Sequence, residues 1–245
     1  RVESGSYPPR RMPRSALAGL VRSDRASVWR AVPMRRGLAV LALGPGLVAV
    51  LGGLPWNTLI ILPGLVASGA ALLYGVNAWC LDARGALWRE SLPVSAGTVF
   101  AARAYVLGEF LLSASLLTIA LAATRAGVPT ASELSAILCA QVVVTVQVVA
   151  GALRWSAQRP YAVDLRSARA TPAPPLTMVG YSARLALTTT LTGLVFSAFA
   201  KVPEWHVSVL VAVPFLCWSL ARLVRTASAW TDPVDRARVV MAVAA

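Results

Sequence analysis

The chain has 245 residues, of which 57% are hydrophobic and only 13% are charged. A soluble domain usually carries about 25% charged residues, so this composition argues against a soluble protein and for a lipid bilayer as the main solvent. The formal net charge of +13 would suit a nucleic-acid-binding protein, but the positions of the arginines, considered below, argue against that class.

The first 36 residues form a basic segment with nine arginines. From about Ser15 to Val32, large apolar residues recur among these arginines, which predicts an amphipathic helix at the membrane interface. Binding to anionic lipid headgroups is one role for such a helix. The chain begins with Arg1 rather than Met and has no signal peptide, so we expect it to lack an upstream portion of a longer protein.

Six apolar runs follow, each near the length of about 20 residues that a transmembrane helix needs. We expect the spans at about 37–53, 57–80, 104–124, 134–154, 180–200 and 206–222. Gly52, Gly53 and Pro55 mark the turn between the first two spans. The runs lack the alternation of barrel strands, so helices must satisfy the backbone in lipid. The predicted fold is therefore an all-α polytopic membrane protein with six transmembrane helices.

The basic residues are distributed very unevenly over the two sides of this arrangement. With six spans, 21 of the 23 arginines and lysines fall on one side, and only Arg125 and Lys201 fall on the other. The positive-inside rule then predicts a cell-membrane protein with both termini in the cytoplasm. The expected organisation is a basic segment at 1–36, a membrane domain at 37–223 with a cytoplasmic loop at 81–103, and a cytoplasmic tail at 224–245. The positive-inside distribution of arginines explains the net charge of the chain, so nucleic-acid binding is not required to explain it.

Three polar residues inside the predicted spans are functional candidates. Glu109 is the one acid well inside a span, where a carboxylate is expensive and often functional. It either pairs with an arginine such as Arg103 or Arg184, or takes part in substrate handling or gating. Gln141 and Thr145 share a helix face that should point into the protein. Hydrogen bonding between helices is the favoured interpretation of that pair over substrate contact.

Nothing in the sequence indicates catalysis or a cofactor. The only histidine is His206, which excludes a multi-histidine metal site. The three cysteines are far apart and lie inside or at the ends of apolar runs, which is typical of small buried residues rather than of a metal site. No phosphate-binding loop, hydrolase motif or kinase motif is present. We therefore expect neither an enzyme nor a metal or cofactor site in this chain.

The loop from Leu81 to Arg103 contains a short predicted helix. Ala86 to Leu92 can form about two helical turns that carry Leu87 and Trp88, and Pro93 ends them. Ser95 is suited to cap a second helix that leads into the next span. A helix this short is not stable alone in water, so it must dock on the membrane, on its own bundle or on a partner.

This loop resembles the first cytoplasmic loop of type-2 ABC exporter permeases. The family text reads like D-R-x-x-G-x-x-x-x-L-x-x-x-P-[VL]-S, with a slightly different spacing to the proline. The matching residues here are Asp82, Arg84, Gly85, Leu92, Pro93, Val94 and Ser95. The stretches GVNAWCLDARGALW and DLRSARATPAPP are similar to large actinobacterial permeases of this kind, and six spans with cytoplasmic ends also match the family.

The resemblance implies a permease subunit that works with a separate ABC ATPase subunit. The short helix would be a coupling helix in a groove of that ATPase, with Leu87 and Trp88 as apolar anchors. Arg89 and Glu90 would be rim charges that fix partner choice, and Arg84 and Pro93 would frame the helix. The N-terminal amphipathic helix would correspond to the elbow helix of the family. A homodimer, or pairing with a second permease half, would complete the channel.

Two other classes of protein remain open. The first is a non-catalytic membrane scaffold or immunity-type protein. The second is a membrane enzyme that acts on lipid-linked phosphate substrates, with the basic stretch from Arg154 to Arg184 holding the phosphates. The cargo of a transporter, the role of Glu109 and the oligomeric state do not follow from the sequence.

Overall fold

The computed structural model describes residues 13–82, 85–163, 171 and 173–245, without the side chain of Tyr74. Over these residues the chain is all-α and contains no strand. The elements are α1 (Ala16–Arg30), α2 (Val32–Gly52), α3 (Trp56–Leu59), α4 (Leu62–Ala70), a π-helical turn η1 (Ala71–Gly75), a 3-10 turn η2 (Ala78–Leu81), α5 (Gly85–Glu90), α6 (Ala96–Ala126), α7 (Ala131–Gln158), α8 (Pro175–Phe199), α9 (His206–Thr231) and α10 (Pro233–Ala244).

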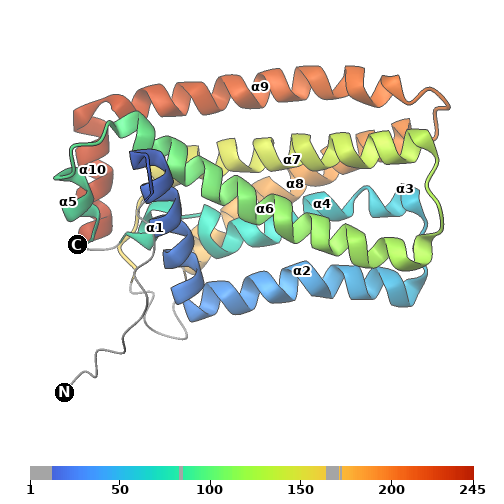
Figure 1. Cartoon of the computed structure of the whole chain (residues 1–245), viewed down its shortest axis with the longest axis horizontal. Coiled ribbons are helices and arrows are strands. Elements are labelled where there is room, and N and C mark those ends of the chain that lie inside the picture. Colours follow the sequence, from blue (N-terminus) through green and yellow to red (C-terminus); the bar gives the residue numbers. More distant parts are fainter. Residues whose placement is uncertain (1–12, 83–84, 164–170, 172) are drawn as a thin grey trace.

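The long helices run side by side along the long axis of the molecule (Figure 1). The short helices α1, α5 and α10 gather at one end, whereas α3 and the turns that precede α7 and α9 lie at the other. Helix α7 occupies the centre and packs against α8 and α9. In the most apolar 18-residue stretch of α7, 67% of the residues are buried. The corresponding value for α9 is 17%, so α9 is the most exposed of the long apolar helices.

Five helical segments of the described chain are long and apolar enough to cross a membrane. They are Val32–Gly52, Trp56–Leu73, Ala96–Ala126, Ala131–Gln158 and His206–Thr231. This identifies a helical membrane protein, but the expected sixth span, α8, is not among them. The reason lies in its composition, because α8 contains Arg184 and five threonines, Thr177, Thr188, Thr189, Thr190 and Thr192.

The outer surface of the bundle is apolar, as a lipid-facing surface must be. Helix α2 exposes Val40, Val48 and Leu51, and α9 exposes Leu210 and Trp218, all by more than 60% of their surface. An apolar surface of this extent is unfavourable in water and favourable against lipid chains. The exposed apolar residues therefore agree with the composition of the chain in indicating a membrane environment.

The second predicted span is not a single helix. The stretch expected as one span at 57–80 consists of α3, α4, η1 and η2, joined by short breaks. Ser156 of α7 stabilises the last break: its hydroxyl donates to the carbonyl of Gly75 at 2.9 Å and accepts from the amide of Ala78 at 2.8 Å. Irregular backbone at membrane depth needs such internal partners, because lipid offers none. The broken segment accordingly lies in the interior, since 56% of the residues in Trp56–Leu73 are buried.

The C-terminal end of the chain folds back on the bundle rather than leaving it. Helix α9 continues beyond the expected span to Thr231, and Asp232 caps α10 by accepting from the amides of Val234 and Asp235. Helix α10 then packs against α5 and η2. Val239, Val240 and Val243 are buried in this contact. The stretch expected as a tail is therefore a structural part of this end of the molecule.

Candidate functional site

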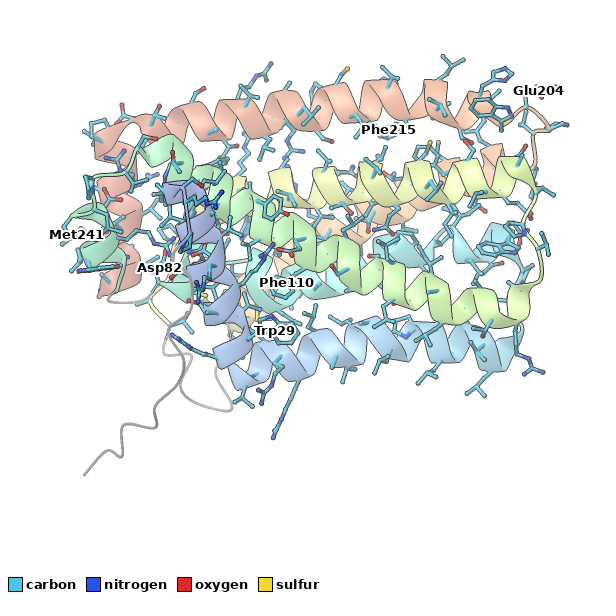
Figure 2. All side chains as sticks on the ribbon, viewed as in Figure 1. Trp29, Asp82, Phe110, Glu204, Phe215 and Met241 are labelled. Atoms are coloured by element: carbon cyan, nitrogen blue, oxygen red, sulfur yellow. The ribbon has the colours of Figure 1, made fainter. Side chains whose placement is uncertain are left out.

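A buried cluster of two acids and two arginines joins four segments at the end of the bundle that carries α1, α5 and α10. We call Asp24, Asp82, Arg89 and Arg103 the ion cluster. Nη2 of Arg89 lies 2.6 Å from Oδ1 of Asp24 and 2.9 Å from Oδ1 of Asp82. Arg103 lies 3.0 Å from Asp24 and 2.7 Å from Asp82. The side chains of Asp24 and Arg103 are 0% and 2% exposed, and Figure 2 shows Asp82 among α1, α5 and α6.

The ion cluster is balanced in charge and nearly complete in its contacts. Two carboxylates face two guanidinium groups, and Nη1 of Arg103 also donates to the carbonyl of Ala78 at the start of η2. Burial of charges is costly unless they are paired and hydrogen-bonded, so each member depends on the others. The cluster therefore fixes the relative positions of α1, η2, α5 and α6.

Aromatic side chains extend the cluster to the C-terminal half of the chain. The guanidinium of Arg103 lies 5.4 Å from the ring centre of Trp79. Trp79 stacks on Trp230 of α9, with centroids 3.8 Å apart and planes 5° from parallel. A cation over a tryptophan face is an attractive pair, especially where water is excluded. The end of α9 is thus packed directly onto the exit of the broken second pass.

Helix α5 has an inner side that is held by charges and an outer side that is free. Leu87 and Trp88, which we call the outer pair, are 50% and 67% exposed. Oε2 of Glu90 forms an ion pair of 2.9 Å with Nε of Arg236 in the C-terminal helix α10. Pro93 is exposed in the turn that follows α5, and Arg84 lies outside the described residues. Ser95 caps α6 as expected, accepting from the amide of Thr98 at 3.2 Å.

The structure corrects the expected role of Arg89 and adds Asp24 to the site. Arg89 was expected as an exposed rim charge, but its side chain is only 10% exposed and belongs to the ion cluster. The reason is that the side chain of Asp24 extends from α1 to the inner side of α5, where it pairs with Arg89. A signal for Asp24 exists in the sequence, since it is the single acid among the arginines of the N-terminal helix. Its partners, 65 and 79 positions away, have no local pattern that would reveal them.

Glu109 pairs with an arginine, but with neither of the two expected ones. Its Oε2 accepts a hydrogen bond of 2.7 Å from Nε of Arg25 in α1, and this bond raises the pKa of Arg25. Arg103 is engaged in the ion cluster instead. The side chains of Arg25 and Glu109 are 42% and 35% exposed, so the pair lies at the periphery of the bundle. One helical position further, Phe110 meets Trp29 edge to face at 5.7 Å (Figure 2).

Gln141 and Thr145 are buried in α7, but the hydrogen bonds that they form stay within that helix. The hydroxyl of Thr145 donates to the carbonyl of Gln141 at 2.7 Å. The contact between helices that was expected of this pair is made instead by Gln147, two residues after Thr145, whose Oε1 accepts from Thr192 of α8 at 3.1 Å. The bond between Gln147 and Thr192 therefore joins α7 to α8, whereas Glu109 pairs with Arg25 and takes no part in these bonds.

Comparison of the chain with family models, with curated proteins and with solved structures found no match. The interpretation of the site therefore rests on its residues and their geometry. The strongest feature is the short helix α5. Its inner side is fixed by ion pairs of Arg89 and Glu90, and its outer side exposes Leu87 and Trp88.

Proposed function

We propose that this chain is the membrane-spanning permease subunit of an ABC exporter and that α5 is its coupling helix, which docks on a separate ATPase subunit. The observation that carries the proposal is the outer pair of α5. Two large apolar side chains, Leu87 and Trp88, stand out at the end of the bundle where the short helices gather. Tryptophan is strongly favoured at the centre of protein interfaces, and leucine adds apolar area beside it.

The attachment of α5 suits a helix that transmits movement. Arg89 connects it to α1 and to the end of the second pass, and Glu90 connects it to α10. A partner that moves α5 would displace these elements together, because breaking the buried pairs costs more than shifting the helices as a unit. ATP hydrolysis in the partner would in this way open and close the bundle.

The orientation in the proposal places α1, α5 and α10 in the cytoplasm. It rests on the basic residues, since Arg125 and Lys201 belong to the end away from α5, whereas the other arginines of the described residues belong to the half of the bundle that carries α5. The proposal also treats α8 as the sixth span, which returns the chain to the cytoplasmic side. Its 25 residues are long enough to cross the bilayer. The hydroxyls of Thr188, Thr189 and Thr192 each donate to a carbonyl one turn earlier in α8, and Thr189 also lies 2.7 Å from the hydroxyl of Ser68.

The docking role is tested by purifying the chain from its native membrane and identifying what remains bound. We expect an ATPase subunit with nucleotide-binding motifs to co-purify with the wild-type chain. Trp88→Ala and Leu87→Asp should both abolish that association while the protein still inserts, because each removes half of the proposed apolar contact.

Trp205→Ala is the matched control. Trp205 is 56% exposed, similar to Trp88, but it precedes α9 at the other end of the bundle. The control variant should keep the ATPase. Association that persists in both α5 variants would rule out the coupling role, and absence of any ATPase from the wild-type preparation would favour the scaffold alternative.

A further inference from the structure

Two neighbouring cavities lined by arginines lie between α7, α8, α9 and α10. The larger, of about 420 Å³, is lined by residues of α7, α9 and α10. The smaller, of about 80 Å³, continues it between α7, α8 and α9. Arg154, Gln158 and Arg222 line both cavities, so the two form one continuous site. The proposed coupling mechanism does not use this site.

The arginines of the site come from three helices and act on one another. Arg222 of α9 is half-buried, and the positive charges of Arg154 of α7 and Arg184 of α8 both act on it. Arg154 and Arg184 are exposed, so solvent weakens the repulsion among the three charges, but together they make this site strongly positive. A negatively charged group bound between these arginines would offset the repulsion.

The described part of the chain does not supply that charge. None of its carboxylates lies within salt-bridge distance of Arg154, Arg184 or Arg222. Asp235 lines the larger cavity, but it faces Arg238 at 3.7 Å, and Arg236 is bound to Glu90.

Buried hydrogen-bond donors point to the same conclusion. Nε of Arg222 is buried and has no partner among the described atoms, and neither has the hydroxyl of Tyr181, which lines the smaller cavity and is 2% exposed. A buried donor without an acceptor costs free energy, so such groups commonly mark the place of a ligand.

The site is open towards the side of the bundle. Helices α8 and α9 both pack on α7 but scarcely touch each other. Near the far end Phe196 of α8 and Phe215 of α9 approach to 6.2 Å, so the space between the two helices is closed there. A ligand could therefore reach the arginines from the headgroup layer as well as from the aqueous side.

From this geometry we infer that Arg154, Arg184 and Arg222 bind a phosphate group. The planar guanidinium matches the oxygens of a phosphate and can bind two of them at once. The side-chain amide groups of Gln147 and Gln158 in the same lining can complete the contacts. The phosphate can be that of an anionic lipid, for which basic pockets between helices are suited, or a soluble phosphate.

The test is native mass spectrometry of the detergent-solubilised full chain titrated with phosphatidylglycerol. Phosphatidylcholine with the same acyl chains is the lipid control, because its choline neutralises the phosphate. The wild-type chain should retain phosphatidylglycerol in preference to phosphatidylcholine. Arg222→Gln should weaken that binding about tenfold, since it removes charge-assisted hydrogen bonds. Arg125→Gln, which removes the same charge at the end of α6, should leave it unchanged.

Two further measurements distinguish a lipid phosphate from a soluble phosphate and show whether a loss of binding is caused by misfolding. If excess inorganic phosphate displaces the lipid, a soluble phosphate group is also a ligand; if it does not, the lipid is the source. Arg184→Gln changes an exposed side chain and repeats the test should Arg222→Gln fail to fold. Equal binding of the two lipids, or equal losses in the Arg222 and Arg125 variants, would overturn the assignment.

Discussion

Nη2 of Arg89 lies 2.6 Å from Oδ1 of Asp24, and this contact joins α5 to α1 across 65 positions of sequence. Both side chains are almost completely buried. The helix that exposes Leu87 and Trp88 is therefore held in place by a buried ion pair. Because the same carboxylate also meets Arg103, a change at Asp24 should affect the whole end of the bundle.

Asp24→Asn should destabilise the protein by about 3 kcal/mol, because it leaves two buried guanidinium groups facing one carboxylate. The measurement is the thermal unfolding midpoint in detergent. Arg238→Gln breaks an exposed pair whose side chains are 62% and 58% accessible, so it should have no measurable effect. Adding Arg89→Gln to Asp24→Asn restores the charge balance and should recover part of the loss. Equal effects of the Asp24 and Arg238 substitutions would contradict the role of the ion cluster.

Cys80 should resist alkylation in the folded protein. Its side chain is completely buried in η2, so a reagent in water does not reach the thiol. Cys217 serves as the internal reference, since α9 exposes it contrary to the expectation of three buried cysteines. Mass spectrometry after maleimide treatment should show modification of Cys217 well before Cys80, and Asp24→Asn should accelerate the reaction of Cys80.

The close approach of α2 and α6 depends on Gly46. A Cβ atom at this position would lie 2.9 Å from the backbone oxygen of Thr118, so Gly46→Ala must push the helices apart. We expect a loss of about 1–3 kcal/mol from overpacking. Gly44, two residues earlier, has no atom within 4 Å of its Cβ position, so Gly44→Ala should be neutral or stabilising by up to about 1 kcal/mol. Thermal unfolding of both variants provides the comparison, and an equal response at the two glycines would show that the contact is unimportant.

The pair of Arg25 and Glu109 should contribute little to stability despite its short distance. Because both side chains are more than one-third exposed, the coupling free energy from a double-mutant cycle of Arg25→Gln and Glu109→Gln should stay below about 1 kcal/mol. The single variants should also keep the bound ATPase. A coupling of several kcal/mol, or loss of the ATPase in Glu109→Gln alone, would instead assign Glu109 a role in substrate handling or gating.

The proposed orientation is tested by cysteine accessibility in intact cells, in a background in which Cys217 and the other native cysteines are replaced by serine. Pro203 lies in the exposed turn before α9 and Ser95 in the exposed turn after α5, at opposite ends of the bundle. A membrane-impermeant maleimide should label Pro203→Cys in intact cells and Ser95→Cys only after permeabilisation. Labelling of Ser95→Cys in intact cells would reverse the orientation.

Much of the secondary structure could be predicted because its signals are local. Ser95 and Pro93 mark the boundaries of α6 and α5, and Gly53 adopts the positive φ of 58° that ends α2. Apolar runs likewise located the long helices, although their ends lie several residues away from the expected ones. The charge of the chain and the presence of Leu87 and Trp88 in the short helix can be read from the sequence, whereas the exposure of these two side chains is seen only in the structure. These features depend on neighbours within a few positions, and the sequence shows such neighbours directly.

The sequence by itself therefore determined the helical class, the membrane environment and the position of the short helix α5. Only the tertiary structure decided that Asp24 sits behind Arg89, that the second pass is broken and supported by Ser156, and that Arg154, Arg184 and Arg222 surround one cavity. The physical reason is that composition and capping act locally. The partner of a buried charge is selected by the packing of helices that are distant in sequence.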